Sequence, residues 1–200
     1  KFVVLKENCR GMKKTLILAV LLTFFTSIFA FDFEYEYENN TLAYTILTDS
    51  TVSVAASSTH QPAGALIIPD SVEHEGLRYA VTEVAKNGFN GKKNITSIML
   101  PSTIKHIRYQ AFRSLTQTHT ITLNEGLETI GNRAFCTSSG LSGTVEIPAS
   151  IDSISGYAFY NCTGIAVIKI NRETPCKLEE EAYYFTNVVK IEVPCQSGRL

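Results

Sequence analysis

The sequence predicts a mainly β repeat protein, in which a solenoid with one parallel β-sheet face follows a small antiparallel β cap. A small residue followed by an aromatic one recurs every 23 or 24 residues, at Gly88-Phe89, Ala111-Phe112, Ala134-Phe135, Ala158-Phe159 and Ala182-Tyr183. An apolar triplet recurs with the same period, at Ile98-Met99-Leu100, Ile121-Thr122-Leu123, Val145-Glu146-Ile147, Ile168-Lys169-Ile170 and Ile191-Glu192-Val193. A period of this length indicates a solenoid, and alternating apolar residues between positions 33 and 56 indicate the cap.

Residues 1–30 have the features of a leader segment. We interpret residues 1–11 as lying upstream of the true start at Met12. Residues 12–30 then predict a secretory signal peptide, because two lysines precede an apolar run that ends at Ala30. An uncleaved membrane anchor is the alternative, but about 15 apolar residues are fewer than the roughly 20 that a spanning helix needs. We therefore expect an exported protein, at the cell surface or extracellular.

The charge balance argues against nucleic acid as a partner. Removal of residues 1–30 takes five basic and one acidic side chain from the 18 and 19 of the whole sequence, which leaves a net charge of about −5. Binding to a phosphate backbone needs clustered Lys and Arg, so a nucleic-acid partner is not expected. The sequence also has no glycine-rich phosphate loop and no serine nucleophile elbow, and we expect no cofactor.

Residues 31–63 predict the N-terminal cap. Apolar and polar residues alternate over 33–37 and again over 42–46, with two asparagines between them, which predicts a β-hairpin. A third alternation over 52–56 extends the hairpin to a meander. A cap is expected here because the terminal coil of a solenoid otherwise exposes its core.

Residues 64–200 predict the solenoid, and both of its ends are irregular. Pro69, which ends the first apolar triplet, lies 32 residues before Pro101, about nine more than the repeat period. The extra residues fall around 73–79, and their charged composition predicts a surface insertion. No polar closing unit follows Pro194, so we expect the intact protein to continue and this solenoid to be C-terminally truncated.

Each apolar triplet predicts a short β-strand, whose first and third residues point inward and whose second points outward. Stacked coils would place these strands side by side in a parallel sheet, ~4.8 Å apart. The outward positions of five strands then form a candidate binding face of ten side chains: Ser97, Met99, Thr120, Thr122, Thr144, Glu146, Val167, Lys169, Lys190 and Glu192. Hydroxyl and charged groups of this kind suit a protein or a glycan.

The remaining positions of each unit predict the other walls of the coil. A proline or an asparagine ends each strand, because proline lacks the N–H that a ladder needs and asparagine favours turns. A second apolar pair follows, at Ile104 and Ile107, Leu127 and Ile130, and Ile151 and Ile154. The alanine then permits close approach, and the phenylalanine fills the space between coils. Phe112, Phe135 and Phe159 should therefore form one buried file.

Three segments contain the clearest copies of the unit: IMLPSTIKHIRYQAF, GLETIGNRAF and VEIPASIDSISGYAFYNCTGI. These units resemble the BspA-type leucine-rich repeat, over about residues 64–195. The resemblance implies a right-handed leucine-rich-repeat solenoid on an exported bacterial protein, often at the cell surface and acting in adhesion or host interaction.

Two departures from that unit should change the local structure. Thr118 and Ser142 replace the first apolar residue of two units, so those coils should be looser there. The last unit, residues 170–185, lacks the Ser-Val and Ile-Gly landmarks, so its convex side should take a different path.

The cysteines and histidines predict no metal site. Four cysteines follow the leader, Cys136, Cys162, Cys176 and Cys195. Disulfides occur in exported proteins, but free buried thiols are favoured because cysteine is commonly buried in this form. No Cys-x-x-Cys pair occurs, and the histidines, His60, His74, His106 and His119, fall at unrelated repeat positions.

Glu146 and Glu192 are the best candidates for catalysis. They lie two coils apart, about 9.6 Å by strand spacing, near the upper end of the roughly 6.5–9.5 Å that separates the carboxyls of inverting glycosidases. However, Lys169 lies between them and favours the charged form of both, which does not suit a general acid. A cross-strand charge ladder explains the three residues better.

The sequence therefore favours a non-enzymatic interaction or adhesion protein. Ten outward side chains are fewer than the roughly 20–30 that a standard interface uses on each side, so binding to an extracellular protein or glycan should be weak or multivalent. A structural stalk that displays a missing C-terminal domain is the alternative. A glycan hydrolase that uses Glu146 and Glu192 is the third hypothesis.

Overall fold

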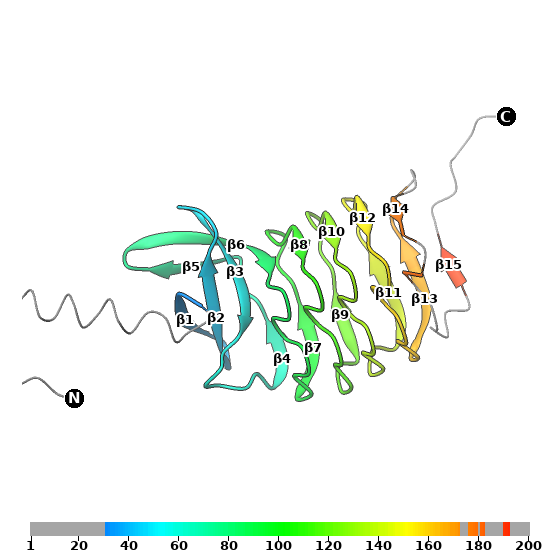
Figure 1. Ribbon diagram of the computed structural model, residues 1–200, viewed down its shortest axis with the longest axis horizontal. Helices are drawn as coiled ribbons and strands as arrows, with labels where there is room; N and C mark the ends of the chain where they lie inside the picture. Colours follow the sequence, from blue (N-terminus) through cyan, green and yellow to red (C-terminus); the bar gives the residue numbers. More distant parts are fainter. Residues whose placement is uncertain (1–30, 173–175, 180, 183–189, 193–200) are drawn as a thin grey trace, which may run out of the picture.

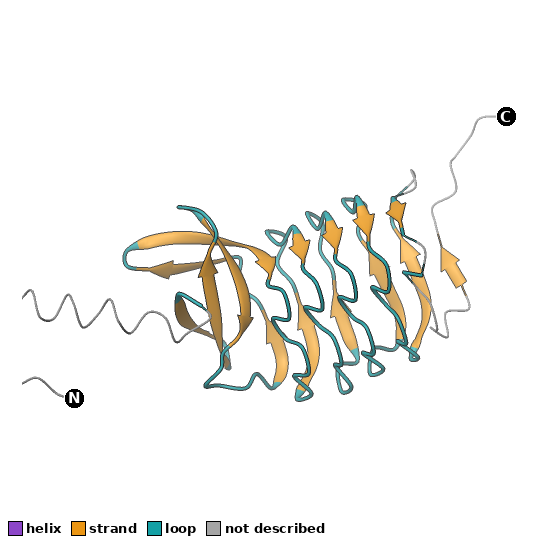
Figure 2. Ribbon diagram, in the orientation of Figure 1, coloured by secondary structure: helices purple, strands orange, loops and turns teal. Residues whose placement is uncertain are grey.

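The computed structural model describes residues 31–172, 176–179, 181–182 and 190–192. These residues form fifteen β-strands that wind into an elongated solenoid with an antiparallel cap at one end (Figure 1, Figure 2). The predicted mainly β architecture is therefore confirmed. The described ranges contain no helix of the length and apolarity that a membrane crossing needs. The predicted signal peptide lies outside the described residues.

Three antiparallel strands form the cap that the alternating pattern predicts. They are β1 (Phe33–Tyr37), β2 (Asn40–Ile46) and β3 (Thr51–Ala56). Their inward side chains cover the end of the core, where the rings of Phe33 and Tyr44 stack with centroids 5.4 Å apart. The Asn40 side chain accepts a hydrogen bond from the Ala63 N–H and donates one to the Ala65 carbonyl. These two bonds tie the cap to the first coil.

The inserted residues of the first coil form a β-hairpin of β5 (Ser71–His74) and β6 (Leu77–Val84). Val72 and Tyr79 are buried, whereas the charged residues at the tip are exposed. Strand β6 also pairs in parallel with β3, so it joins the cap to the solenoid. The insertion was predicted around residues 73–79 as a surface feature. It also has a structural role, because its second strand, β6, belongs to the sheet that connects the cap with the coils.

One side of the coils continues the cap into a nine-stranded sheet. It does so through four two-residue parallel strands, β8 (His106–Ile107), β10 (Thr129–Ile130), β12 (Ser153–Ile154) and β14 (Lys177–Leu178). All six residues of the predicted second apolar pairs are buried. The prediction that they line a second wall of the coil is confirmed.

The other side holds the strands that the apolar triplets predict, in two parallel sheets of three strands. One sheet contains β4 (Gly64–Ile67), β7 (Ile95–Met99) and β9 (Thr120–Thr122), and the other contains β11 (Gly143–Ile147), β13 (Ile165–Ile170) and β15 (Lys190–Glu192). The expected continuous sheet is interrupted between β9 and β11. Within the described residues, β9 is only three residues long and pairs with β7 but not with β11.

A buried file of phenylalanines runs through the coils. Phe89, Phe112, Phe135 and Phe159 are fully buried. Successive rings are stacked, with centroids 5.4, 5.5 and 5.1 Å apart and planes within 13° of parallel. The predicted single file is confirmed, and Phe89 extends it by one coil.

Each phenylalanine lies in a turn with a repeated backbone conformation. The residues two before and two after it have φ between 54° and 72°: Asn87, Gln110, Arg133 and Tyr157 before, and Gly91, Ser114, Thr137 and Asn161 after. Most side chains disfavour this left-handed conformation. Hydrogen bonds between coils hold it here, such as those from the Phe112 N–H to the Ala134 carbonyl at 2.8 Å and from the Ser114 N–H to the Cys136 carbonyl at 2.9 Å.

The first expected departure from the repeat did not have the predicted effect. Thr118 is fully buried, and its hydroxyl donates to the Ile95 carbonyl at 2.8 Å, so this coil is not looser. The equivalent position one coil later is occupied by buried Leu141, and Ser142 lies outside the core. In the last unit, Ala182 accepts a hydrogen bond from the Phe159 N–H, as the equivalent alanines do in earlier turns. Residues 173–175, 180 and 183–185 of this unit lie outside the described residues, so its different convex path stays a prediction.

Replacement of Phe135 by alanine tests the importance of the file. Because Phe135 is packed between Phe112 and Phe159, we expect the free energy of unfolding to fall by about 3–5 kcal/mol. Urea denaturation measures this change. Met99→Ala is the control, because Met99 is 52% exposed and its loss should cost less than about 0.5 kcal/mol. Equal effects of the two variants would contradict the buried file.

Replacement of Thr118 by valine tests the buried hydroxyl. Valine keeps the shape but leaves the Ile95 carbonyl without this donor, so we expect a loss of about 1–3 kcal/mol of stability. Thr122→Val, on the exposed face of β9, should change stability much less. A Thr118→Val protein as stable as the parent would show that the position tolerates the apolar residue of the repeat.

Candidate functional site

The strand face arranges the ten predicted binding residues in four rows. The rows are Ser97–Thr120 and Met99–Thr122 on the first sheet, and Thr144–Val167–Lys190 and Glu146–Lys169–Glu192 on the second. The described side chains among them are at least partly exposed. Among the residues whose side chains are described, their inward neighbours on the strands are buried, except that Ile121 is only partly buried. The face is thus two adjacent patches, the first rich in hydroxyl groups and the second charged.

The charged row is an ion-pair ladder. Lys169 Nζ lies 3.4 Å from Glu146 Oε1, and the Asn171 side chain donates to Glu146 Oε2 at 3.3 Å. Lys169 also lies opposite Glu192 on the next strand. Glu146 is therefore already engaged by two donors, which fits a cross-strand charge ladder better than a catalytic acid. An exposed pair of this kind adds little stability.

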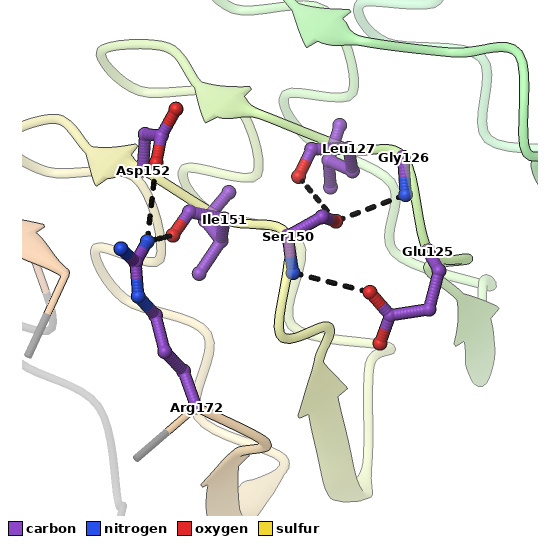
Figure 3. A network of polar contacts seen from close by, with 7 residues as sticks. All are labelled: Glu125, Gly126, Leu127, Ser150, Ile151, Asp152 and Arg172. Atoms are coloured by element: carbon purple, nitrogen blue, oxygen red, sulfur yellow. Dashed lines mark hydrogen bonds and ion pairs between the residues drawn. The ribbon is translucent and has the colours of Figure 1, made fainter. Parts of the chain in front are cut away.

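Figure 3 shows a polar network at the turns beside the strand face. Ser150 Oγ donates to the Leu127 carbonyl at 2.8 Å, and the Ser150 N–H donates to the Glu125 carboxylate at 3.1 Å. One coil later, Arg172 pairs with Asp152 at 3.1 Å. Each of these contacts joins one coil to its neighbour and satisfies a polar group of the turn. The network therefore fixes the stacking of the coils.

The histidines occupy four different environments. His74 stacks on a cap phenylalanine with ring centroids 4.1 Å apart, and His106 shares a hydrogen bond of 2.9 Å with a threonine of the next coil. His60 and His119 are exposed. Within the described ranges, no group of three or more His, Cys, Asp or Glu is placed to hold a metal ion.

The cysteines Cys136, Cys162 and Cys176 are free and buried, as predicted, and Cys195 lies outside the described residues. Burial raises the pKa of Cys162 to about 12, and it raises the pKa of Cys136 and of Cys176 as well. A thiol with a raised pKa is a poor nucleophile and a poor metal ligand. These cysteines therefore act as small core residues.

A hollow beside the phenylalanine turns was not predicted. It has a volume of about 530 Å³ and is lined by Gln110, Arg113, Arg133, Cys136, Thr137, Tyr157 and Tyr160. We refer to it as the arginine hollow. Its residues come from three consecutive coils. In each coil they lie two residues before, one residue after or two residues after the phenylalanine of the turn. Arginine and tyrosine at these repeated positions are the sequence signal that could have indicated it.

Stacked coils with short parallel strands on one side and a buried aromatic file define a leucine-rich-repeat solenoid. The family described as BspA type leucine rich repeat region matches residues 82–200, in six copies. The chain therefore belongs to the BspA-type leucine-rich-repeat family, and the resemblance found in its units is confirmed.

Solved structures with the same fold come from several bacteria. A leucine-rich repeat protein from Bacteroides ovatus has a TM-score of 0.65 and 22% identity, over 80% of this chain and 42% of that one. The pneumococcal vaccine antigen PcpA has a TM-score of 0.58 and 19% identity, over 82% and 51%. A leucine rich cell surface protein from Faecalibacterium prausnitzii has a TM-score of 0.56 and 20% identity, over 80% and 51%.

These comparisons establish the fold and the family. The chain spans about half of the length, or less, of each of those three proteins. No curated protein sequence matches the chain.

The buried thiol of Cys162 predicts a dependence of stability on pH. In the unfolded chain this thiol ionises near its ordinary pKa of 9.0, whereas burial keeps it protonated up to about pH 12 in the folded protein. The unfolded state therefore loses its proton first, and stability should fall above about pH 9, by up to roughly 1.4 kcal/mol per pH unit. Urea denaturation between pH 8 and 11 measures the slope, and Cys162→Ala should make it shallower. Identical slopes would contradict this assignment.

Proposed function

We propose that this protein is a non-enzymatic, exported or cell-surface protein that binds an extracellular protein or glycan through its strand face. The observation that carries the proposal is the set of exposed hydroxyl and charged side chains that successive strands present in rows. A cell surface protein and a vaccine antigen among the similar solved structures support a location outside the cell.

The size of the strand face favours weak or multivalent contact. Its ten outward residues are fewer than the roughly 20–30 that a standard protein interface uses on each side. Several weak contacts that are linked on one surface can together bind tightly, provided that all can engage at once. The parallel sheets hold the side chains at a regular spacing, which lowers the entropy that is lost on binding.

The contacts of Glu146 support a non-enzymatic role. Its two carboxylate oxygens engage Lys169 and Asn171, so the residue is part of a ladder. A glycan hydrolase that uses Glu146 and Glu192 therefore has less support than a binding protein. A structural stalk that displays a further domain is the second candidate, and it is favoured by the stacking contacts that run along the whole described solenoid.

Replacement of Glu146, Lys169 and Glu192 by serine in one protein tests the strand face. We expect binding to immobilised extracellular matrix proteins or glycans to fall by at least roughly tenfold, because the charged row is lost while the buried strand residues are kept. Surface plasmon resonance measures the binding, and thermal melting shows whether the variant is folded.

A matched control removes charges elsewhere. Lys105 and Glu128 form an exposed ion pair of 2.7 Å beside the nine-stranded sheet, and their joint replacement by serine should leave binding unchanged. Unchanged binding of the folded triple variant would favour the stalk. Release of reducing sugar by the purified chain would favour the hydrolase.

A further inference from the structure

The arginine hollow lies on a different part of the coil from the strand face. Its seven lining residues belong to the turns that carry Phe112, Phe135 and Phe159. Stacking brings equivalent positions of successive turns together, so Gln110, Arg133 and Tyr157 form one column. Arg113, Cys136 and Tyr160 form the other. The hollow therefore exists only when three coils are stacked.

The two arginines of the hollow differ from Arg108 and Arg172, which form ion pairs, and from Arg78, which donates two hydrogen bonds to the Ser71 hydroxyl. Arg108 pairs with Glu83 and Arg172 pairs with Asp152. In the described part of the chain, neither Arg113 nor Arg133 makes an ion pair. Arg113 Nε is buried and has no hydrogen-bond partner among the described groups. A buried donor without a partner is costly unless a ligand satisfies it.

Cys136, which lies between Arg113 and Tyr160 in its column, does not neutralise this positive charge. Burial raises the pKa of the Cys136 thiol overall, whereas the charges of Arg113 and Arg133 and a hydrogen bond from the Arg113 side chain act in the opposite direction. The thiol is therefore uncharged at neutral pH and supplies no counter-ion to the two guanidinium groups that line the hollow. The nearby carboxylate of Glu181 hydrogen-bonds Tyr157.

The tyrosines hold one of the arginines in place. The Arg133 guanidinium carbon lies 5.3 Å from the centre of the Tyr157 ring, within the range of a cation–π contact. Tyr157 in turn meets Tyr160 edge to face, with centroids 5.5 Å apart, and hydrogen-bonds Glu181 in the next coil. This chain of contacts orders the Arg133 side chain before any ligand arrives, which lowers the cost of binding.

We propose that the arginine hollow binds a sugar residue that carries a carboxylate or a sulfate group. Guanidinium groups recognise such planar or tetrahedral anions through paired hydrogen bonds. The tyrosine rings supply apolar surface with a polar tip, and Gln110 supplies a neutral amide suited to sugar hydroxyls. The volume of about 530 Å³ is within the range of small-molecule sites and exceeds what an inorganic anion needs. This site does not depend on the strand face.

Titration of the full chain with paired disaccharides tests the proposal. The probes are digalacturonate against neutral galactobiose, and a sulfated heparin disaccharide against its desulfated form, followed by calorimetry. We expect a charged member to bind roughly tenfold or more tightly than its neutral partner, because it alone engages the arginines. The affinity should fall as salt is added. Which charged sugar binds identifies the carboxylate or the sulfate as the recognised group.

Substitutions in the hollow locate the binding. Arg113→Gln and Arg133→Gln should each weaken binding of the charged disaccharide by roughly tenfold. Arg133 is exposed, so its variant keeps the test valid if Arg113→Gln does not fold. Arg108→Gln is the matched control and should bind normally, because Arg108 is paired with Glu83 outside the hollow. The triple serine variant of the strand face should also bind normally, which separates this site from the proposed function.

Several results would overturn the proposal. These are the absence of binding by both charged disaccharides, equal binding of the neutral partners, or full affinity in the folded Arg133→Gln variant. Competition by sodium sulfate at the same concentration as the disaccharide would also overturn it, since the sugar would then contribute nothing.

Discussion

The stacking of Phe89, Phe112, Phe135 and Phe159 is the interaction on which the rest of the solenoid depends. The ring centroids lie 5.1–5.5 Å apart, close to the ~4.8 Å between hydrogen-bonded strands. Each coil must therefore advance by nearly the same distance at the strand face, at the two-residue strands and at the aromatic turn. A unit of 23 or 24 residues meets this condition on all sides at once, which explains why the period varies so little.

Because every coil advances by nearly the same distance, equivalent residues of successive coils lie side by side and form columns on the surface. Residues one unit apart become neighbours, so Lys169 meets Glu146 on the strand face and Arg133 lies over Tyr157 at the aromatic turn. Neither pair is close in the sequence. Two candidate binding regions on different sides of one coil therefore arise from the same repeat, and each can vary without disturbing the buried positions. This separation of core and surface is compatible with the proposed binding role.

The cap shows how the protein closes an end that the repeat leaves open. Without it, the apolar residues of the first coil would face water. Strand β6 pairs with β3 on one side and with β8 on the other, so the cap and the coils share one sheet. In the cap, the Phe33 and Tyr44 rings form a stacked pair of their own. The inserted hairpin therefore has a structural role, because its strand β6 joins the cap to the coils. Only its charged tip is a surface feature.

The sequence by itself determined the solenoid, the strands, the second apolar wall and the aromatic file, because these follow from side chains that repeat with one period. The outward direction of the strand residues followed from alternation along each strand. Only the tertiary structure decided the break between β9 and β11, the hydrogen bond that accommodates Thr118, and the arginine hollow. These depend on backbone dihedrals and on contacts between coils. The residue types that line the hollow differ from coil to coil, so the period alone does not mark them, and they meet only when neighbouring coils are packed together.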